Sequence, residues 1–250
     1  MAKIIPELAS YKDATIIHIQ DRASELGMSD LKSYYEYLRT NEEEQQFLKK
    51  NLTKLGSHFF RGEDWEFFKT SCLSQFAGKK DIRIWCAGCS SGQEVYSTLM
   101  SILDYVDIND VSVLATDYND DLLAKCADAS YFNMHYHEVP EKYQKYVDQG
   151  EKKFVMKPEL KSVVTTKHLN LLTDEYPKDV DIIICRNVLK FFSIDVIDSI
   201  HVRFADSLRS GGFLFVSADD DEKNKHSEFV RNPEKLGMSQ VEDRSIFRKN

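Results

Sequence analysis

Residues 82–100 read IRIWCAGCSSGQEVYSTLM, and this stretch decides the fold. A hydrophobic run over residues 82–86 passes through Gly88 and Gly92 into a segment whose apolar residues recur at helical spacing. The pattern predicts a strand, a tight turn and a helix. Doubly wound α/β folds hold a nucleotide-like ligand at such a junction.

The composition is that of a globular protein with an acidic balance. The chain has 250 residues, a net charge of −8 at pH 7 and 42% hydrophobic residues, which suits one larger domain with a smaller companion. Binding to nucleic acid relies on Lys and Arg to neutralise phosphates, so the charge argues against nucleic acid as the main partner. We see no apolar signal segment and no run of roughly 18 apolar residues. We therefore expect a cytoplasmic protein with no membrane insertion.

Two short patterns invite a metal or redox interpretation. Cys86 and Cys89 form a C-x-x-C, but a second pair for zinc is missing and the glycine turn explains the spacing. Small buried cysteines are the simpler interpretation, with a redox or metal role as the alternative. His135 and His137 form an H-x-H without a third ligand at suitable spacing. We therefore expect no metal site.

The N-terminal part of the chain carries helical patterns and little that is typical of a strand. Ser29 is a candidate cap for one helix, and Thr40 with Glu43 forms a capping box that opens a second. We expect an N-terminal helical domain over residues 1–75. The last part of this domain is an aromatic cluster around Arg61. Arg61 is either a functional arginine or, as the alternative, a surface arginine on a packed helix.

Strands and helices alternate from residue 82 onward. A second apolar run covers residues 111–115, and Asp117 follows it. An acidic residue at the end of the second strand is where such folds accept hydrogen bonds from a ribose diol. The alternative role for Asp117 is a helix N-cap.

Residues 131–168 interrupt the alternation. Two extended segments on either side of Pro158 predict an antiparallel β hairpin at about residues 150–168. We expect this hairpin to be inserted into a larger domain that spans residues 76–250.

Six segments in a fixed order carry a family resemblance. They are LTKLGSHFFR (52–61), AGCSSGQEVYS (87–97), ATDYNDDLLAKC (115–126), NLL (170–172), CRNVLKFF (185–192) and LRSGGFLFVS (208–217). Together they resemble the CheR-type chemotaxis receptor methyltransferases, from about Leu26 to the end of the chain. The resemblance implies an α/β fold, with a doubly wound Rossmann-like methyltransferase sheet, an N-terminal helical domain and a small inserted antiparallel β subdomain.

The resemblance also implies an activity and a site. The family transfers methyl groups from S-adenosylmethionine to glutamate side chains on the cytoplasmic helices of chemoreceptors, leaving S-adenosylhomocysteine. In such enzymes the cofactor is touched by residues that fall here on Ser57, Arg61, Glu94, Asp117, Asn170, Leu171, Cys185 and Arg186, and we add Gly88 of the turn.

The chemistry of such a transfer demands little of the protein. A sulfonium methyl group is already electrophilic and a glutamate carboxylate is already an anion, so the step needs alignment and desolvation but no general base. Arg61 and Arg186 are then the candidate catalytic residues, as clamps for carboxylates of the cofactor or of the substrate.

Two departures from the family leave alternatives open. Phe191 stands where the family usually has a tyrosine, so a hydroxyl expected near the transferred methyl group is missing. Residues 9–27 offer only Lys12 and Arg22 as basic residues, whereas the family's N-terminal helix is strongly basic. The alternatives are a binding module with little or no turnover and a related methyltransferase with another acceptor. The sequence leaves open the oligomeric state, with a monomer favoured, and whether the hairpin tethers a receptor tail by adding a strand.

Overall fold

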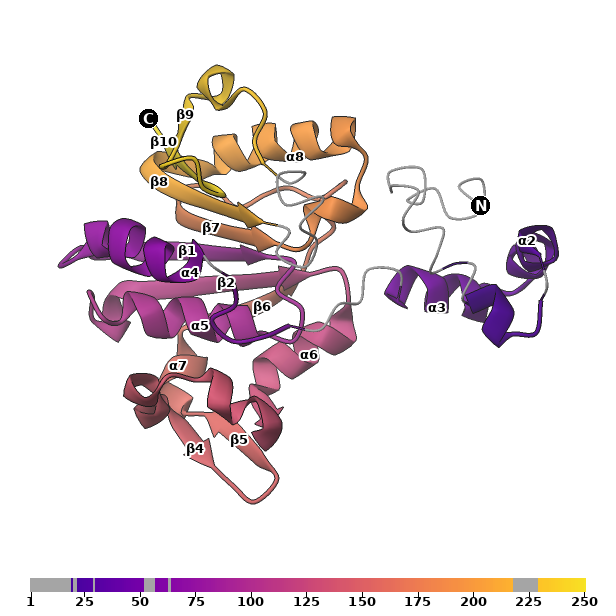
Figure 1. The fold of residues 1–250 in the computed structure, drawn as a ribbon, viewed down its shortest axis with the longest axis horizontal. Coiled ribbons are helices and arrows are strands. Elements are labelled where there is room, and N and C mark those ends of the chain that lie inside the picture. Colours follow the sequence, from indigo (N-terminus) through magenta and orange to yellow (C-terminus); the bar gives the residue numbers. More distant parts are fainter. Residues whose placement is uncertain (1–18, 20–21, 29, 52–56, 63, 218–228) are drawn as a thin grey trace.

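The structure is a computed structural model that describes residues 19, 22–28, 30–51, 57–62, 64–217 and 229–250 (Figure 1). A seven-stranded sheet with the order β6-β2-β1-β7-β8-β10-β9 forms its centre. In chain order these strands are β1 Ile82–Ala87, β2 Val111–Asp117, β6 Val164–His168, β7 Val180–Arg186, β8 Leu208–Ser217, β9 Met238–Gln240 and β10 Ile246–Lys249.

The sheet is mostly parallel and reverses its strand order beside β1. The strands β6, β2, β1, β7 and β8 run parallel to their neighbours, whereas β10 is antiparallel to both β8 and β9. The chain builds outward from β1 through β2 to β6 and then returns to β7 on the other side of β1. Open α/β sheets bind ligands at this switch point, outside the carboxyl ends of the strands. The predicted doubly wound α/β fold is confirmed.

Helices cover both faces of the sheet because its central strands are buried on both sides. In β1, Ile84 packs into the core beneath helix α5 (Gln93–Ile102), and Trp85 packs into the core beneath helix α8 (Ile194–Ser207). Successive side chains of a strand point to opposite faces, so an uninterrupted apolar run serves both cores. The other sheet-domain helices are α4 Asp64–Phe67, α6 Asp120–Asp128 and α7 Pro158–Ser162. Within the described ranges, no helix is long and apolar enough to cross a membrane.

Short irregular helical segments join these elements. They are η2 Phe68–Cys72 and η3 Leu73–Phe76, which continue α4, and then η4 Ile108–Asp110, η5 Asn133–Glu138, η6 Glu141–Tyr146, η7 Leu189–Phe191 and η8 Pro233–Leu236.

The aromatic residues between positions 59 and 76 pack against the sheet. Phe59, Trp65 and Phe68 are buried in the core on the α5 face. The ring of Phe68 lies 4.8 Å from that of Phe215 on β8, centroid to centroid. We therefore propose that the division between the helical domain and the sheet domain falls before Phe59 and not at residue 75.

A small antiparallel sheet is inserted after α6, and it differs from the expected hairpin. Its strands are β3 Ser130–Phe132, β4 Val147–Gln149 and β5 Lys153–Met156, in the order β3-β5-β4. The expectation of two paired strands around Pro158 is wrong. Pro158 instead opens α7, where its fixed φ suits the first helical position. The following β-branched run forms β6, which pairs with β2 at the edge of the main sheet. Figure 1 shows the small sheet beside α7.

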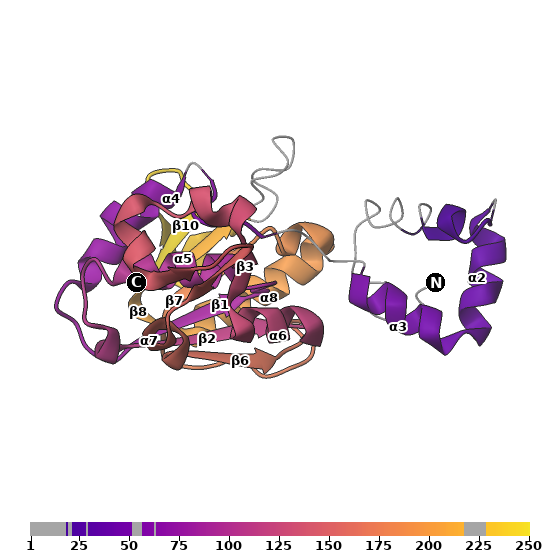
Figure 2. The ribbon, with the colours of Figure 1, turned by 90° about the horizontal axis from the view of Figure 1, so that it is seen from below.

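The N-terminal region contains a pair of helices, α2 Leu31–Thr40 and α3 Glu42–Asn51. Tyr34 and Leu38 are buried in a small core of their own, and the Tyr34 hydroxyl donates to Glu44 at 2.8 Å. Arg22 also donates to the Glu44 carboxylate, at 2.9 Å. Both views show this pair apart from the sheet (Figure 1, Figure 2).

The helix caps lie one residue later than expected. Asp30 caps α2 by accepting from the backbone N–H of Lys32 and Ser33, and the expected cap, Ser29, lies outside the described residues. Asn41 Oδ1 accepts from the backbone N–H of Glu44 at 2.8 Å, so Asn41 caps α3 in place of Thr40. Asp and Asn are as good at the N-cap position as Ser and Thr. In both helices two neighbouring residues could therefore serve as the cap, and the sequence alone does not choose between them.

Candidate functional site

The turn between β1 and α5 depends on two glycines for close packing. Gly88 has φ +77°, and a Cβ there would meet Val188 Cγ2 at 2.5 Å. Gly92 has φ +94°, and a Cβ there would meet Cys126 Sγ at 2.7 Å. Only glycine combines this backbone conformation with such an approach. The glycines thus let the turn lie against the end of β7 and against α6.

Asp117 fastens this turn to the end of β2. Its Oδ2 accepts from the backbone N–H of Ser90 at 2.8 Å and its Oδ1 from that of Asn119 at 2.9 Å. Burial raises the pKa of Asp117, although these N–H groups favour the carboxylate. The N-cap of α6 is Asn119, so the alternative role of Asp117 as that cap is wrong. Asp117 lies, as expected, at the carboxyl edge of the sheet.

Arg186, the last residue of β7, forms an ion pair with Glu94 across the switch point. Its Nη1 donates to Glu94 Oε1, and the two side chains are 2% and 19% exposed. Glu94 lies in the first turn of α5, where the helix dipole also favours a negative charge. The carboxylate of Glu94 is therefore held in one place at the carboxyl edge.

Arg186 also joins two other parts of the chain. Its Nε donates to the Ser217 hydroxyl at the end of β8, at 2.8 Å, and its Nη2 donates to the main-chain carbonyl of Arg61, at 2.7 Å. The guanidinium carbon lies 4.6 Å from the centroid of the Phe215 ring. These contacts indicate that Arg186 positions Glu94 and the Arg61 backbone. Its expected role as a carboxylate clamp stays a prediction.

The remaining expected cofactor residues lie along the same edge or lead toward it. Leu169 N donates to the Asp117 carbonyl at 3.1 Å, which brings Asn170 and Leu171 next to the end of β2. Asn170 Oδ1 accepts from Leu172 N at 2.9 Å, so this side chain shapes the turn. The buried Cys185 lies in β7, directly before Arg186.

Arg61 reaches this group through its main chain, as described above, and Ser57 begins the segment that carries it. Both side chains are partly exposed. The structure thus brings Glu94, Arg186 and the Arg61 backbone into direct contact. Ser57 lies in the same segment, four residues before Arg61.

Sequence reasoning missed two polar residues at this edge. Ser217 is 3% exposed and is held by Arg186. Asn187 adopts φ +57°, and within the part of the chain that the structure describes its buried Oδ1 has no hydrogen-bond partner. Both residues end or follow a parallel strand on the side where Asp117 was found, so strand position was the usable signal.

All five cysteines are buried and unpaired by disulfides, in agreement with the simpler interpretation of C-x-x-C. Burial raises the pKa of the Cys72 thiol to about 12 and keeps that of Cys86 well above its ordinary value. A reactive or metal-binding cysteine needs a lowered pKa. Glu94 and Asp117, and not these thiols, stay the expected functional side chains beside the turn.

Comparisons with known proteins show which family the chain resembles. Residues 56–235 match the model of a family described as CheR methyltransferase, SAM binding domain. A chemotaxis protein methyltransferase of Listeria monocytogenes is 31% identical over 188 residues, which cover 73% of this chain and 68% of that protein. One from Borreliella burgdorferi is 28% identical over 234 residues, covering 85% and 83%. Chemotaxis protein methyltransferase 1 of Pseudomonas aeruginosa is 37% identical over 154 residues, covering 57% and 56%.

Proposed function

Because the chain belongs to the CheR methyltransferase family, we propose that it transfers methyl groups from S-adenosylmethionine to glutamate carboxylates of a chemoreceptor or a related signalling protein. The observation that carries this proposal is the pair of carboxylates, Glu94 and Asp117, fixed at the switch point of the sheet. The acceptor would be a cytoplasmic helix of the partner protein.

The residues at this edge fit the cofactor. S-adenosylmethionine is positively charged at its sulfonium and ammonium groups, so negatively charged side chains favour its binding. Its ribose diol needs hydrogen-bond acceptors. Asp117 accepts hydrogen bonds from the backbone N–H groups of Ser90, Asn119 and Tyr118, while a carboxylate has about four acceptor positions. Asp117 would hold the ribose, and Glu94 would hold a hydroxyl or the ammonium group.

The bound cofactor supplies an electrophilic methyl group on a sulfonium centre. The chain's own residues align the partners and exclude water, and none needs to remove a proton from an ionised carboxylate. Arg186 contributes to the alignment, because it holds Glu94 on α5 and the main chain of Arg61 in one arrangement. The Arg61 guanidinium would bind a carboxylate of the acceptor or the cofactor.

Calorimetry and methyl transfer test this proposal in two steps. Titration with S-adenosylmethionine and with S-adenosylhomocysteine should show binding of both. Incubation of the protein with labelled cofactor and with membranes that contain chemoreceptors should then give label that base releases as methanol, as a carboxyl ester does. Tight cofactor binding without any base-labile incorporation would refute glutamate methylation.

A binding module with little turnover is a second candidate, and Phe191 is the observation that favours it. Phe191 ends the η7 turn, five residues after Arg186, the last residue of β7, and it has no hydroxyl. The substitution Phe191→Tyr restores the group that the family usually has. A large rise in turnover with unchanged cofactor affinity would support impaired activity in the natural chain, and no change would remove this reason for doubting turnover.

A different acceptor is the third candidate, and Arg22 favours it. Of the two basic residues in the region expected to meet an acidic receptor, Arg22 forms ion pairs with Glu25 and Glu44, and Lys12 lies outside the described residues. The charge of Arg22 is thus largely compensated within the helical domain. Mass spectrometry of the labelled acceptor distinguishes this candidate from the first.

A further inference from the structure

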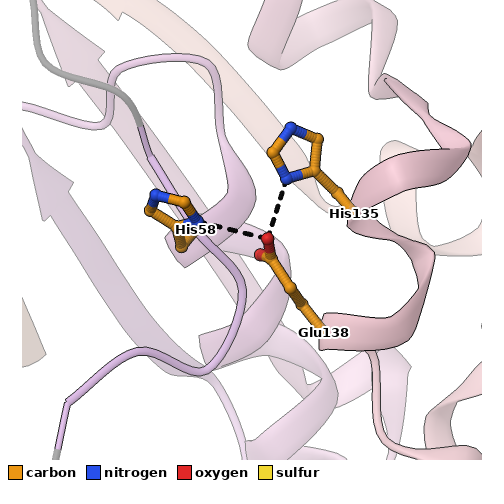
Figure 3. Close-up of side chains that lie close together, drawn as sticks. All are labelled: His58, His135 and Glu138. Carbon is orange, nitrogen blue, oxygen red and sulfur yellow. Dashed lines mark hydrogen bonds and ion pairs between the residues drawn. The ribbon is translucent and has the colours of Figure 1, made fainter.

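Two histidines, one of them next in sequence to the expected cofactor residue Ser57, converge on one carboxylate oxygen. Glu138 Oε1 lies 2.8 Å from His135 Nδ1 and 3.2 Å from His58 Nδ1 (Figure 3). One ligand atom from each residue lies within 4.8 Å of the other two. In the ranges that the structure describes, no other group of three His, Cys, Asp or Glu residues meets this condition.

The local backbone explains the convergence. His135 and Glu138 are three residues apart in η5, a 3₁₀ segment, where side chains at i and i+3 eclipse one another. His137 is two residues from His135 and projects in another direction. The H-x-H pattern of His135 and His137 therefore does not bring its two side chains together, whereas the H-x-x-E pattern of His135 and Glu138 does.

The third residue arrives from a distant part of the chain. Phe59 is buried and its ring packs 5.0 Å from Tyr131 and 5.8 Å from Phe154, centroid to centroid. This packing places His58 over the inserted subdomain. The Phe59 backbone N–H donates to Glu138 Oε2 at 2.8 Å, which turns the other oxygen, Oε1, toward the two rings.

We propose that His58, His135 and Glu138 bind a zinc ion that fastens the segment of residues 57–61 to the inserted subdomain. Tetrahedral zinc with bonds of about 2.0–2.1 Å places its ligand atoms roughly 3.3 Å apart. The observed separations of 2.8 and 3.2 Å from the shared oxygen approach this value. The ligand nitrogens of the two imidazoles lie within 4.8 Å of each other, so a modest rearrangement of the two rings would complete this spacing.

The ligand set selects the kind of metal. Two imidazoles with one carboxylate suit zinc, whereas magnesium and calcium prefer oxygen ligands alone. The His58 side chain is 44% exposed, so a water molecule can fill the fourth position. The bond from Phe59 N–H to Glu138 supplies the support from outside the ligand shell that such sites use to orient a carboxylate. Binding would release any proton held by the nitrogen atoms that ligate the metal, because metal ligands must be deprotonated.

Zinc chloride titrated into the tag-free, chelator-treated full chain tests the proposal by calorimetry. One zinc ion should bind per chain. We expect His58→Ala, His135→Ala and Glu138→Gln each to weaken binding more than about tenfold, as loss of a ligand or its support does. His137→Ala is the matched control, because it removes a histidine from the same segment without touching the cluster, and its affinity should stay unchanged.

Two outcomes would overturn the site. Equal zinc uptake by the natural chain and by the His58→Ala/His135→Ala double variant would show that zinc binds elsewhere; both proteins keep all five cysteines. Heat of similar size from magnesium chloride would exclude a site built on imidazole nitrogen. Circular dichroism of each variant confirms that it is folded, and none of these measurements depends on methyl transfer.

Discussion

The segment of residues 57–61 is attached to the sheet domain at both ends, and the two attachments differ in kind. At one end, Arg186 donates to the Arg61 carbonyl from a guanidinium that is 2% exposed. At the other end, Glu138 accepts from Phe59 N–H and meets His58, which is 44% exposed. The buried attachment has a permanent charge, whereas the exposed one contains groups that protons and metals can change. We therefore expect the first attachment to persist across conditions and the second to vary with pH.

Loss of the buried attachment should have the largest effect. We expect Arg186→Ala to lower the free energy of unfolding by about 3 kcal/mol or more, because the substitution leaves the Glu94 charge without its partner. Urea denaturation measures the change. Arg231→Ala, which breaks an exposed pair with Asp198, is the control and should leave the midpoint unchanged. Equal effects of both substitutions would contradict the view that the buried ion pair stabilises the fold more than an exposed pair does.

Asp117 tests whether the buried edge is also the binding site. Asp117→Ala should weaken S-adenosylmethionine binding by about 1–3 kcal/mol, since it removes an acceptor from a desolvated position. Calorimetry on the folded variant measures this loss. Asp120→Ala, at an acidic side chain that is 78% exposed three residues later, should leave the affinity as it was. If both variants bind equally well, the ribose lies elsewhere.

Glu138 tests the exposed attachment. Glu138→Gln keeps the shape and an acceptor for Phe59 N–H but removes the charge, so we expect a loss of about 1 kcal/mol in the free energy of unfolding. Hydrogen exchange at residues 57–61 should speed up more than exchange in β7. A uniform acceleration across both regions would mean that the two attachments are not separable.

The pH dependence of the exposed attachment has a defined sign. Burial opposes ionisation of Glu138, but hydrogen bonds from His135, Phe59 N–H and His58 outweigh it and lower the pKa below the ordinary 4.5. A lowered pKa in the folded state means that the stabilisation is present above the unfolded value and is lost as the pH falls through the folded value. Protection of the amides of residues 57–61, taken relative to the intrinsic exchange rate at each pH, should therefore fall on acidification, by less in Glu138→Gln. The opposite pH trend would show that Glu138 is not the controlling group.

The main sheet and the position of Asp117 at its carboxyl edge were predictable because they follow from local patterns. The run from Ile82 through the glycine turn into α5 folds as expected, and Asp117 lies at the end of its strand. Strand and helix periodicity are local signals, and parallel strands place their carboxyl ends along one edge. The order of the residues was therefore enough to predict the strands and helices of the main sheet and the position of Asp117.

Features that depend on distant partners or on near-equal local choices were not predictable. Pro158 suits either a break between strands or the start of a helix, and only the pairing of β6 with β2 decides between them. The convergence of His58 with Glu138 joins residues 80 positions apart. Neither the sequence around His58 nor the sequence around Glu138 suggests a set of metal ligands by itself. The contacts of Arg186 likewise combine a helix, a strand and a loop that no short motif connects.

The burial of every native thiol makes this chain suitable for site-specific labelling. Cys72, Cys86, Cys89, Cys126 and Cys185 are all enclosed, so maleimide reagents should pass over them under native conditions. A single introduced thiol, for example at Ile194, which is 53% exposed at the start of α8, would then carry a fluorophore alone. Such a reporter would follow ligand binding in a protein whose natural cysteines need no replacement.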